Sequence, residues 1–328
     1  MEALAHYLRG RIEAFGGPID VRQFRGGQSN PTYYLKTQRG EYVLRRKPPG
    51  RLLPSAHAIE REYRVMRSLR GTGVPVPEVL LLCDDPAIIG TPFYLMQYVD
   101  GRPMIDPALA GRPASDRRAV YDSMISVLAQ LHMVDWRAAG LADFGKPTDY
   151  VARQIHRWTV QYRSSETERI DAMERLIDWL PANLPDGDET AIVHGDYRPG
   201  NLLVHPTQPR IAAVVDWELS TLGHPLADLA HHVLLFRTDP EELGAFGGKS
   251  PPDGIPNEEE HLARYCQLTG RPELPDWDFY VAFAMFRFAA ILQGITGRVA
   301  AGTANDPAGR IVGARAKSLA ERAWRLIE

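Results

Sequence analysis

The residues His194–Asn201 read HGDYRPGN, and Asp216 follows them at the end of an apolar run. The stretch places a carboxylate at Asp196, an amide five residues later at Asn201, and then the second carboxylate at Asp216. Phosphoryl transfer uses this set, because one carboxylate orients and deprotonates the attacking hydroxyl while an amide and another carboxylate hold magnesium on the nucleotide phosphates. Protein kinases share the five-residue step, and Asp216-Trp217-Glu218 stands where their Asp-Phe-Gly does. The motif therefore predicts a small-molecule kinase.

The segment between Asn201 and Asp216 has the pattern of a β-hairpin. Leu202–Val204 and Ile211–Val215 are apolar runs, and Pro206–Pro209 carries turn chemistry. Because a hairpin returns the chain, we expect Asn201 and Asp216 to lie side by side, as a divalent cation with oxygen ligands requires. The alternative is that the aspartates of the motif are only cap or turn residues, but several elements in the right order argue against it.

Length and composition set the broad class of the chain. Its 328 residues are enough for two lobes with cores of their own, and 44% hydrophobic and 24% charged residues are ordinary for a globular protein. The formal net charge of −3 argues against a nucleic-acid partner, which would favour a basic excess. The two cysteines, Cys83 and Cys266, can form at most one disulfide, so we expect a reducing, cytoplasmic setting.

We expect no association with a membrane. The first residues lack the basic region and long apolar region of a signal peptide. The most apolar segment, Tyr280–Gly297, contains Arg287 and Gln293, which favours a buried helix over a membrane span.

Periodicity divides the chain into a strand-rich first part and a helical remainder. The expected strands are Tyr33–Leu35, Tyr42–Leu44, Val79–Cys83 and Phe93–Val99, with one helix over Ile59–Leu69. The later expected helices are Arg117–Met133, Tyr150–Tyr162, Thr167–Leu180, Glu258–Leu268, Phe279–Gly294 and Arg310–Ile327. This order predicts an α+β, bilobal protein-kinase-like fold. A small N-terminal antiparallel-sheet lobe (residues 1–98) would bind nucleotide, and a larger, mainly helical lobe (residues 99–328) would carry catalysis and the acceptor.

The loop Gly26–Asn30 precedes the expected strand pair and contains two glycines. Its backbone N–H groups can face phosphates, because glycine permits close approach and unusual backbone angles. Gly26, Gly27, Ser29 and Asn30 are therefore candidate nucleotide-binding residues. A tight hairpin turn explains the loop equally well, since it is not a G-x-G-x-x-G motif.

Arg45 and Glu62 are the candidates for the cation–carboxylate pair that holds nucleotide phosphates in kinases. Arg45 ends the strand Tyr42–Leu44, and Glu62 lies on the following helix. Most kinases use lysine here, but arginine stays charged and can bind phosphate in a bidentate fashion. The alternative is that Arg45, Arg46 and Lys47 form a solvated run of charges.

A hinge between the lobes is expected near Gln97 to Gly101, after the strand Phe93–Val99. The backbone of Gln97 and Val99 could hydrogen-bond an adenine edge there. The side chains of these residues say little, because backbone groups make such contacts.

Two other motifs are set aside. Gly244–Ser250 resembles a P-loop, but Leu243 stands at the required first glycine, so we expect a loop. The pair His231-His232 lacks the spacing of a metal site, and the segment around Asp228 is expected to begin a helix under the His194 loop. Asp228 could then hydrogen-bond the backbone around His194, in a structural role.

With these residues in place, the chain resembles the aminoglycoside phosphotransferase/choline kinase superfamily over essentially its whole length. Within it the chain is most similar to the kinase-like domain fused to some acyl-CoA dehydrogenases and to its free-standing bacterial relatives. The segments that carry the resemblance are Gln28–Thr32, Tyr42–Gly50, Leu53–His57 and, the most specific, Asp216–Ala230.

The resemblance implies ATP, magnesium and phosphorylation of a hydroxyl group on a small molecule. The closest branch is associated with hydroxylated fatty acids or their CoA thioesters, notably 4-hydroxyacyl chains, whose phosphate becomes a better leaving group. By the motif match, Asp196 would be the base and Asn201 with Asp216 the magnesium ligands. Arg45 with Glu62 would be the phosphate clamp. Because the resemblance accounts for the sequence without a dehydrogenase domain, we expect a separate acyl-CoA dehydrogenase to supply that activity.

Charge near the C-terminus offers a test of the acceptor class. Residues Phe279 to Glu328 include seven Lys and Arg against three acids. The final helices of this fold help line the acceptor pocket, where a hydroxy acid or acyl-CoA favours cations and an aminoglycoside favours carboxylates. The excess favours an anionic acyl acceptor over an aminoglycoside or choline-like amino alcohol, although a solvated helix face would show it too. A kinase for another small alcohol, such as a sugar, stays an alternative. A nucleotide-binding pseudokinase scaffold is the remaining alternative, and the intact Asp196, Asn201 and Asp216 argue against it.

Overall fold

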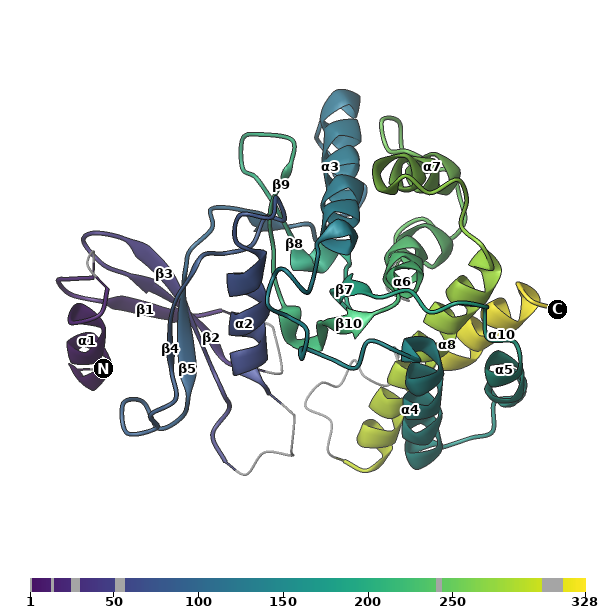
Figure 1. Ribbon diagram of the computed structural model, residues 1–328, viewed down its shortest axis with the longest axis horizontal. Coiled ribbons are helices and arrows are strands. Elements are labelled where there is room, and N and C mark those ends of the chain that lie inside the picture. Colours follow the sequence, from purple (N-terminus) through teal and green to yellow (C-terminus); the bar gives the residue numbers. More distant parts are fainter. Residues whose placement is uncertain (1, 13–14, 25–29, 51–56, 240–243, 303–314) are drawn as a thin grey trace.

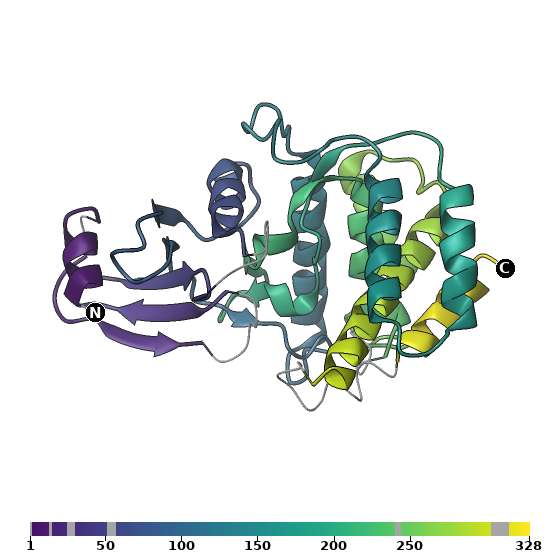
Figure 2. The ribbon, with the colours of Figure 1, turned by 90° about the horizontal axis from the view of Figure 1, so that it is seen from below.

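The computed structural model describes residues 2–12, 15–24, 30–50, 57–239, 244–302 and 315–328. The chain forms a sheet lobe from its first part and a mainly helical lobe from the remainder, and the two lie next to one another along the longest axis (Figure 1, Figure 2). The expected α+β, kinase-like architecture is confirmed. The division between residues 98 and 99 stays a prediction.

The sheet of the first lobe has five antiparallel strands in the order β1-β2-β3-β5-β4. The strands are β1 (Asp20–Gln23), β2 (Thr32–Lys36), β3 (Glu41–Arg46), β4 (Val79–Cys83) and β5 (Phe93–Gln97). Helix α1 (Glu2–Arg9) packs on one face, and α2 (Ile59–Leu69) lies on the other, toward the second lobe (Figure 1).

Alternation along β3 determines what each face of the sheet carries. Tyr42 and Leu44 lie in the small core shared with α1, whereas Val43 lies in the main core on the α2 side. Because side chains alternate along a strand, Arg45 shares the face of Val43 and is directed at α2. Glu62 is buried on the facing side of α2. The strand period and the helix period therefore bring this cation and carboxylate together.

The second lobe is built around one long apolar helix. Its helices are α3 (Ala114–Met133), α4 (Tyr150–Ser165), α5 (Asp171–Ala182), α6 (Pro225–Arg237), α7 (Glu258–Thr269), α8 (Trp277–Ala300) and α10 (Ala316–Arg325). Helix α8 is long and apolar enough to cross a membrane, but 83% of its most apolar window is buried inside the protein. It packs against α4, α6 and α10, so it is the core helix that the sequence predicted.

Short strands at the lobe boundary carry the sequence motif. The expected hairpin forms from β8 (Leu202–Val204) and β9 (Ile211–Val214), with β6 (Arg102–Pro103) at its edge. Strands β7 (Ala191–Val193) and β10 (Thr221–Gly223) form a second, two-stranded ladder. The 3₁₀ turns Pro199–Asn201 and Trp217–Leu219 follow Asp196 and Asp216. Both candidate aspartates therefore stand where a strand gives way to a turn.

Several expected boundaries were wrong. Strand β5 ends at Gln97 and does not reach Val99, because only Tyr98 continues the pairing, through its N–H to the Glu41 oxygen. Helix α5 begins at Asp171, since Gln293 of α8 holds the preceding turn through the Ser165 carbonyl and the Thr167 hydroxyl. The last helix begins at Ala316, and the expected start at Arg310 lies outside the described residues.

Candidate active site

The backbone before Asp196 is held by a buried carboxylate of α6. Asp228 accepts the N–H groups of His194 (2.8 Å) and Gly195 (2.9 Å), which confirms the structural role expected for it. Gly195 has φ +83°, and a Cβ there would lie 2.7 Å from the Leu219 carbonyl oxygen. This position therefore needs glycine for both its backbone angle and its close packing.

Three donors fix the carboxylate of Asp196. Its Oδ2 accepts from Asn201 Nδ2 (2.8 Å) and Arg198 Nε (3.0 Å), and its Oδ1 lies 3.0 Å from His231 Nε2. Burial raises the pKa of Asp196, but the hydrogen bond and charge of His231, with Arg198, outweigh burial and hold that pKa below its ordinary value. Asp196 is therefore ionised at neutral pH and able to accept a proton.

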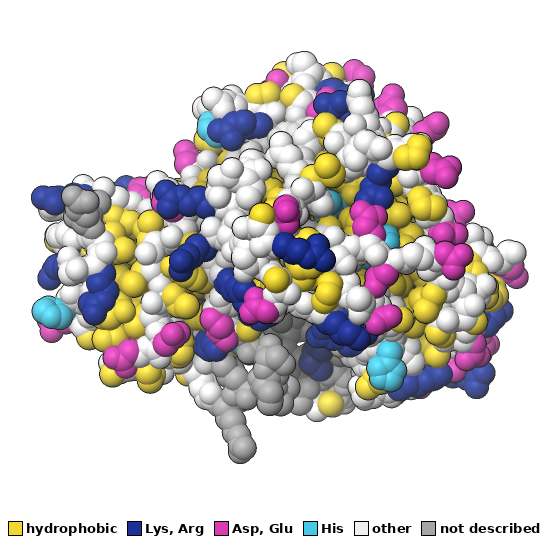
Figure 3. All heavy atoms as spheres, in the orientation of Figure 1, with side chains coloured by type: hydrophobic (Ala, Val, Ile, Leu, Met, Phe, Trp, Pro, Cys, Tyr) yellow, Lys and Arg dark blue, Asp and Glu magenta, His cyan; other side chains and the backbone are white. Residues whose placement is uncertain are grey.

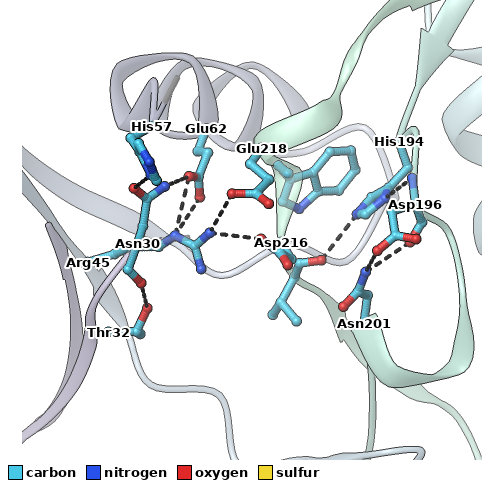
Figure 4. Close-up of polar contacts among 12 residues, drawn as sticks. Asn30, Thr32, Arg45, His57, Glu62, His194, Asp196, Asn201, Asp216 and Glu218 are labelled. Carbon is cyan, nitrogen blue, oxygen red and sulfur yellow. Dashed lines mark hydrogen bonds and ion pairs between the residues drawn. The ribbon is translucent and has the colours of Figure 1, made fainter. Parts of the chain in front are cut away.

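Asn201 and Asp216 meet as the hairpin predicted. The N–H of Val215 donates to the Asn201 carbonyl oxygen (2.9 Å), and Asp216 follows with φ +68°. In Figure 4 the Asp216 side chain lies between Arg45 and the adjoining pair of Asn201 and Asp196. The turn at Asp216 directs its carboxylate toward the sheet lobe, where Arg45 reaches it.

The donor set at Asn201 and Asp216 fits magnesium. Asn201 Nδ2 donates twice to Asp196, to its backbone oxygen (2.9 Å) and its carboxylate (2.8 Å), which leaves Asn201 Oδ1 as an acceptor. Asp216 is 34% exposed at its side chain and has a second carboxylate oxygen besides the one bound to Arg45. Magnesium suits a few oxygen ligands of this kind and completes its shell with phosphate oxygens and water.

Arg45 links the two lobes. Its Nε lies 2.9 Å from Glu62 Oε2, its Nη2 donates to Asp216 Oδ1 (2.8 Å), and Glu218 Oε2 is 3.5 Å away (Figure 4). The side chain is 13% exposed, so the interpretation as a solvated charge run was wrong for Arg45. Burial lowers the pKa of Arg45, but the facing carboxylates outweigh burial and raise it, so the group stays charged.

Glu62 is a buried carboxylate surrounded by donors. Tyr94 donates its hydroxyl to Glu62 Oε2 (3.1 Å), and Asn30 Nδ2 donates to Oε1 (2.9 Å). Burial raises the pKa of Glu62 to about 7, while the Arg45 charge opposes this rise. Three donors converge on it, and an ionised carboxylate accepts from all of them, so the geometry is that of the charged form.

The nucleotide-loop predictions fall mostly outside the described residues. Gly26, Gly27 and Ser29 are among those not described. Asn30 is buried, and its amide contacts Glu62 and, 3.1 Å away, His57 Nδ1. The Asn30 side chain therefore supports the Arg45–Glu62 pair, and its contact with nucleotide stays a prediction.

Only some backbone groups of the hinge residues Gln97 and Val99 could still hydrogen-bond an adenine edge, as the sequence predicted. The Gln97 N–H donates to the Glu78 oxygen (2.8 Å), so this N–H is not free for adenine. The Gln97 carbonyl and the Val99 N–H are the groups on which the prediction now depends.

Sequence reasoning missed His231, Arg198 and Arg287. His231 was treated as a residue of a packing helix, and its contact with Asp196 spans 35 positions along the chain. Arg287 of α8 donates its Nη2 to the Gly195 oxygen (2.6 Å) across 92 positions. The one available signal was the presence of an arginine inside an otherwise apolar helix, since such a charge needs a buried partner.

Comparison with known proteins identifies the family. The model of the phosphotransferase enzyme family matches residues 20–253. The chain belongs to the phosphotransferase enzyme family. Membership confirms the expected class, a phosphotransferase that acts on a hydroxyl group with ATP and Mg²⁺.

Among curated proteins, acyl-CoA dehydrogenase family member 10 of Mus musculus is 48% identical over 98% of this chain and 31% of its own length. Family member 11 of Homo sapiens is 42% identical over 90% of this chain and 39% of its own length. The chain thus spans well under half of these relatives.

Among solved structures, a Ralstonia eutropha protein described provisionally as an aminoglycoside phosphotransferase is 49% identical, with a TM-score of 0.91 over 99% of this chain and 97% of that one. A spectinomycin phosphotransferase in complex with ADP and spectinomycin has a TM-score of 0.66 over 99% and 98% of the two chains. Its sequence identity of 12% shows the fold alone.

Proposed function

We propose that this chain transfers the γ-phosphoryl group of ATP to the hydroxyl of a hydroxy acid or hydroxyacyl-CoA, with a 4-hydroxyacyl chain as the preferred type. The observation that carries the kinase chemistry is the convergence of Asp196, Asn201 and Asp216 at the lobe boundary, with Arg45 reaching them from the sheet. A scaffold that only binds nucleotide would have no need of a fixed, ionised base.

Each residue of this set has a distinct task. Asp196 is held by three donors in the ionised form, accepts the proton of the acceptor hydroxyl, and orients its oxygen for attack as the bond to the departing ADP breaks. Bound magnesium supplies charge neutralisation on the phosphates, and Asn201 Oδ1 with Asp216 would hold it. Arg45 would exchange Asp216 for phosphate oxygens while Glu62 keeps it in place.

The acyl acceptor is supported by the relatives. The curated proteins that match this chain along nearly all of its length bear the name of acyl-CoA dehydrogenases, and their matching part is only a fraction of each. Phosphorylation of a hydroxyl beside an acyl chain would give a leaving group for later acyl catabolism. A cellular partner with dehydrogenase activity is part of this proposal.

The test is ADP release by the purified chain with a panel of acceptors. We expect turnover with 4-hydroxy acids or their CoA esters and little with choline or kanamycin. Asp196→Asn should lower the rate constant by roughly 10² to 10⁴-fold, the usual range for a positioned acid or base. Turnover of choline or kanamycin alone would replace the acyl acceptor by an amino alcohol or antibiotic. If neither the wild-type chain nor Asp196→Asn releases ADP with any acceptor, the pseudokinase scaffold would be favoured.

A further inference from the structure

A cavity of about 590 Å³ opens beside the candidate base. Gly195, which precedes Asp196, is part of its wall, together with residues of α2, α4, α8 and the turn after Asp216. Figure 3 shows basic side chains next to a hollow between the positions of α2 and α4 in Figure 1. A cavity of this size holds a small organic acid or part of a larger ligand. An acceptor placed there lies against Gly195, the residue before Asp196.

Arginine side chains from three helices line this cavity: Arg61 of α2, Arg157 of α4 and Arg287 of α8. The one carboxylate of the described lining is Glu218, which faces Arg45 at 3.5 Å. The wall therefore carries an excess of positive charge. Polycationic acceptors are disfavoured in such a site, and anions are attracted to it.

Arg287 is the most buried of the three, with 7% of its surface exposed. It donates Nη2 to the Gly195 oxygen, and its Nε is buried with no partner among the described residues. Arg287 forms no salt bridge with a carboxylate among the described residues. A buried guanidinium without a carboxylate is costly, so an anionic ligand in the cavity would complete its hydrogen bonding.

Arg61 and Arg157 also lack carboxylate partners in the described part of the chain. Arg61 Nη2 donates to the backbone oxygens of Phe144 (2.5 Å) and Ser220 (3.4 Å), which fixes its position without neutralising it. Arg157 is exposed on α4, with its guanidinium 5.6 Å from the centre of the Trp158 ring. Three cations, two of them fixed by backbone oxygens, thus surround one cavity.

We infer that the cavity lined by Arg61, Arg157 and Arg287 binds an anionic oxygen group of the acceptor. This inference rests on the proposed function and assigns it a subsite. The group is either the carboxylate of a free hydroxy acid or a phosphate of a CoA ester, since planar guanidinium groups bind both. The acceptor is thereby anchored beside Gly195, with its hydroxyl directed at Asp196.

The experiment compares two acceptors that differ only in charge, 4-hydroxypentanoate and its neutral amide. We expect wild-type protein to favour the acid in kcat/KM, and Arg157→Gln or Arg287→Gln to lower the acid-to-amide ratio by about tenfold or more, because a charge-assisted hydrogen bond is lost. Arg287→Lys keeps the positive charge but loses the two parallel N–H donors of the guanidinium, so its acid-to-amide ratio should lie between those of wild-type protein and Arg287→Gln. Arg169→Gln is the charge-matched control. The Arg169 side chain is 73% exposed, pairs with Asp171 and is not part of the cavity wall.

Binding gives a second readout that does not depend on turnover. In calorimetric titrations with ADP and magnesium present, 4-hydroxypentanoate should bind wild-type protein and bind Arg157→Gln about tenfold more weakly. Because Arg157 is exposed, its substitution should leave the fold intact, and a melting curve checks this.

The two proposals fail in different ways. If acid and amide are phosphorylated equally, and the arginine variants change neither this ratio nor the turnover of 4-hydroxypentanoyl-CoA, the anion subsite is wrong while the kinase stands. If no hydroxy compound is phosphorylated, and the acid nevertheless binds through Arg157, the proposed acceptor reaction fails and the subsite stands. Repeating the series with 4-hydroxypentanoyl-CoA identifies the source of the anion, because a variant effect confined to the CoA ester assigns its phosphates and one confined to the free acid assigns the carboxylate.

Discussion

Three donors surround the Asp196 carboxylate, which is therefore well oriented but weakly basic. His231 and Arg198 hold its pKa below the ordinary value of a carboxyl group, and a loose phosphoryl-transfer transition state requires orientation of the hydroxyl more than a strong base. The contacts of Asn201, Arg198 and His231 therefore orient the carboxylate, and its basicity is lower as a result.

His231 should matter for the rate more than for nucleotide affinity. Removing its Nε2 donor in His231→Leu frees Asp196 Oδ1, and we expect kcat to fall about tenfold to a hundredfold, since hydrogen bonds to charged groups contribute about 1.5–3 kcal/mol. The KM for ATP should stay within about twofold, because His231 lies on the α6 side, away from Arg45. His231→Gln should restore part of kcat. Equal changes in kcat and in the KM for ATP would contradict this assignment.

Asp216 should determine the magnesium requirement. Asp216→Ala removes one of few protein oxygen ligands, so the magnesium concentration for half-maximal rate should rise roughly tenfold or more, along with a lower rate. Asn201→Ala should act in the same direction, through its Oδ1 and through Asp196. Titration of activity with MgCl₂ at fixed ATP measures both, with the exposed Asp171→Ala as control. An ordinary magnesium dependence in Asp216→Ala shows that the assignment is wrong.

The site residues that could be predicted from the sequence are those whose partners lie close to them along the chain or are brought back by a short hairpin. Asp196 and Asn201 stand five positions apart, and the hairpin returns Asp216 to them, so the pattern along the chain predicts the meeting in space. His231 and Arg287 could not be found in this way. Their contacts with Asp196 and Gly195 depend on how α6 and α8 pack, which no short motif states.

At the scale of elements, strand β3 and helix α2 act as one unit with the turn after Asp216. Arg45 is their common contact, because it binds Glu62 within the sheet lobe and Asp216 across the lobe boundary. The Arg45–Asp216 ion pair joins the two lobes, and the phosphates of a bound nucleotide would compete for the same guanidinium.

Arg45 should be replaceable by lysine but not by an uncharged side chain. Arg45→Met leaves Glu62 buried without its cation, so we expect about 3–5 kcal/mol lower stability together with a loss of activity. Arg45→Lys should keep activity within about tenfold, at a higher KM for ATP, because a point charge replaces the fork. Denaturant unfolding and ATP kinetics measure the two effects. Arg46→Met, on the opposite face of β3, is the matched control, and a loss there equal to that of Arg45→Met would refute the interpretation.

Elements with a strong period were predictable, and short ones were not. Helix α2 and the β8–β9 hairpin appear where periodicity and turn residues placed them. Strands β7 and β10 have three residues each and exist through their mutual pairing, so neither segment carries enough pattern to be recognised alone. Helix α1 was missed for a similar reason, since its eight residues gain their order by packing on the sheet.

At the scale of the whole molecule, neutral histidines form part of the core of the helical lobe. His232 Nε2 and His261 Nε2 lie 3.0 Å apart, and His224 stacks on Tyr280 with its Nε2 3.1 Å from the hydroxyl. Burial lowers the pKa of His224 and of His232 to about 4, and it places the pKa of His261 well below its ordinary value. Each of these rings is therefore neutral in the folded protein at pH 7.

These histidines should make the fold sensitive to mild acid. A lowered folded pKa means that the unfolded chain binds protons first, so stability is complete above pH 6.5 and is lost as pH falls from 6.5 toward 4. Glu62, whose pKa is raised to about 7, acts in the opposite direction over part of this range, but it is one group against three. Melting temperatures should fall as pH is lowered from 7.5 to 4.5. His261→Gln should make this fall smaller, because the variant removes one buried ring that titrates and also removes a neighbour that disfavours protonation of His232. His156→Gln, at an exposed position of α4, should keep the wild-type slope. A flat wild-type profile, or equal slopes in both variants, would show that the buried rings are not the source of acid sensitivity.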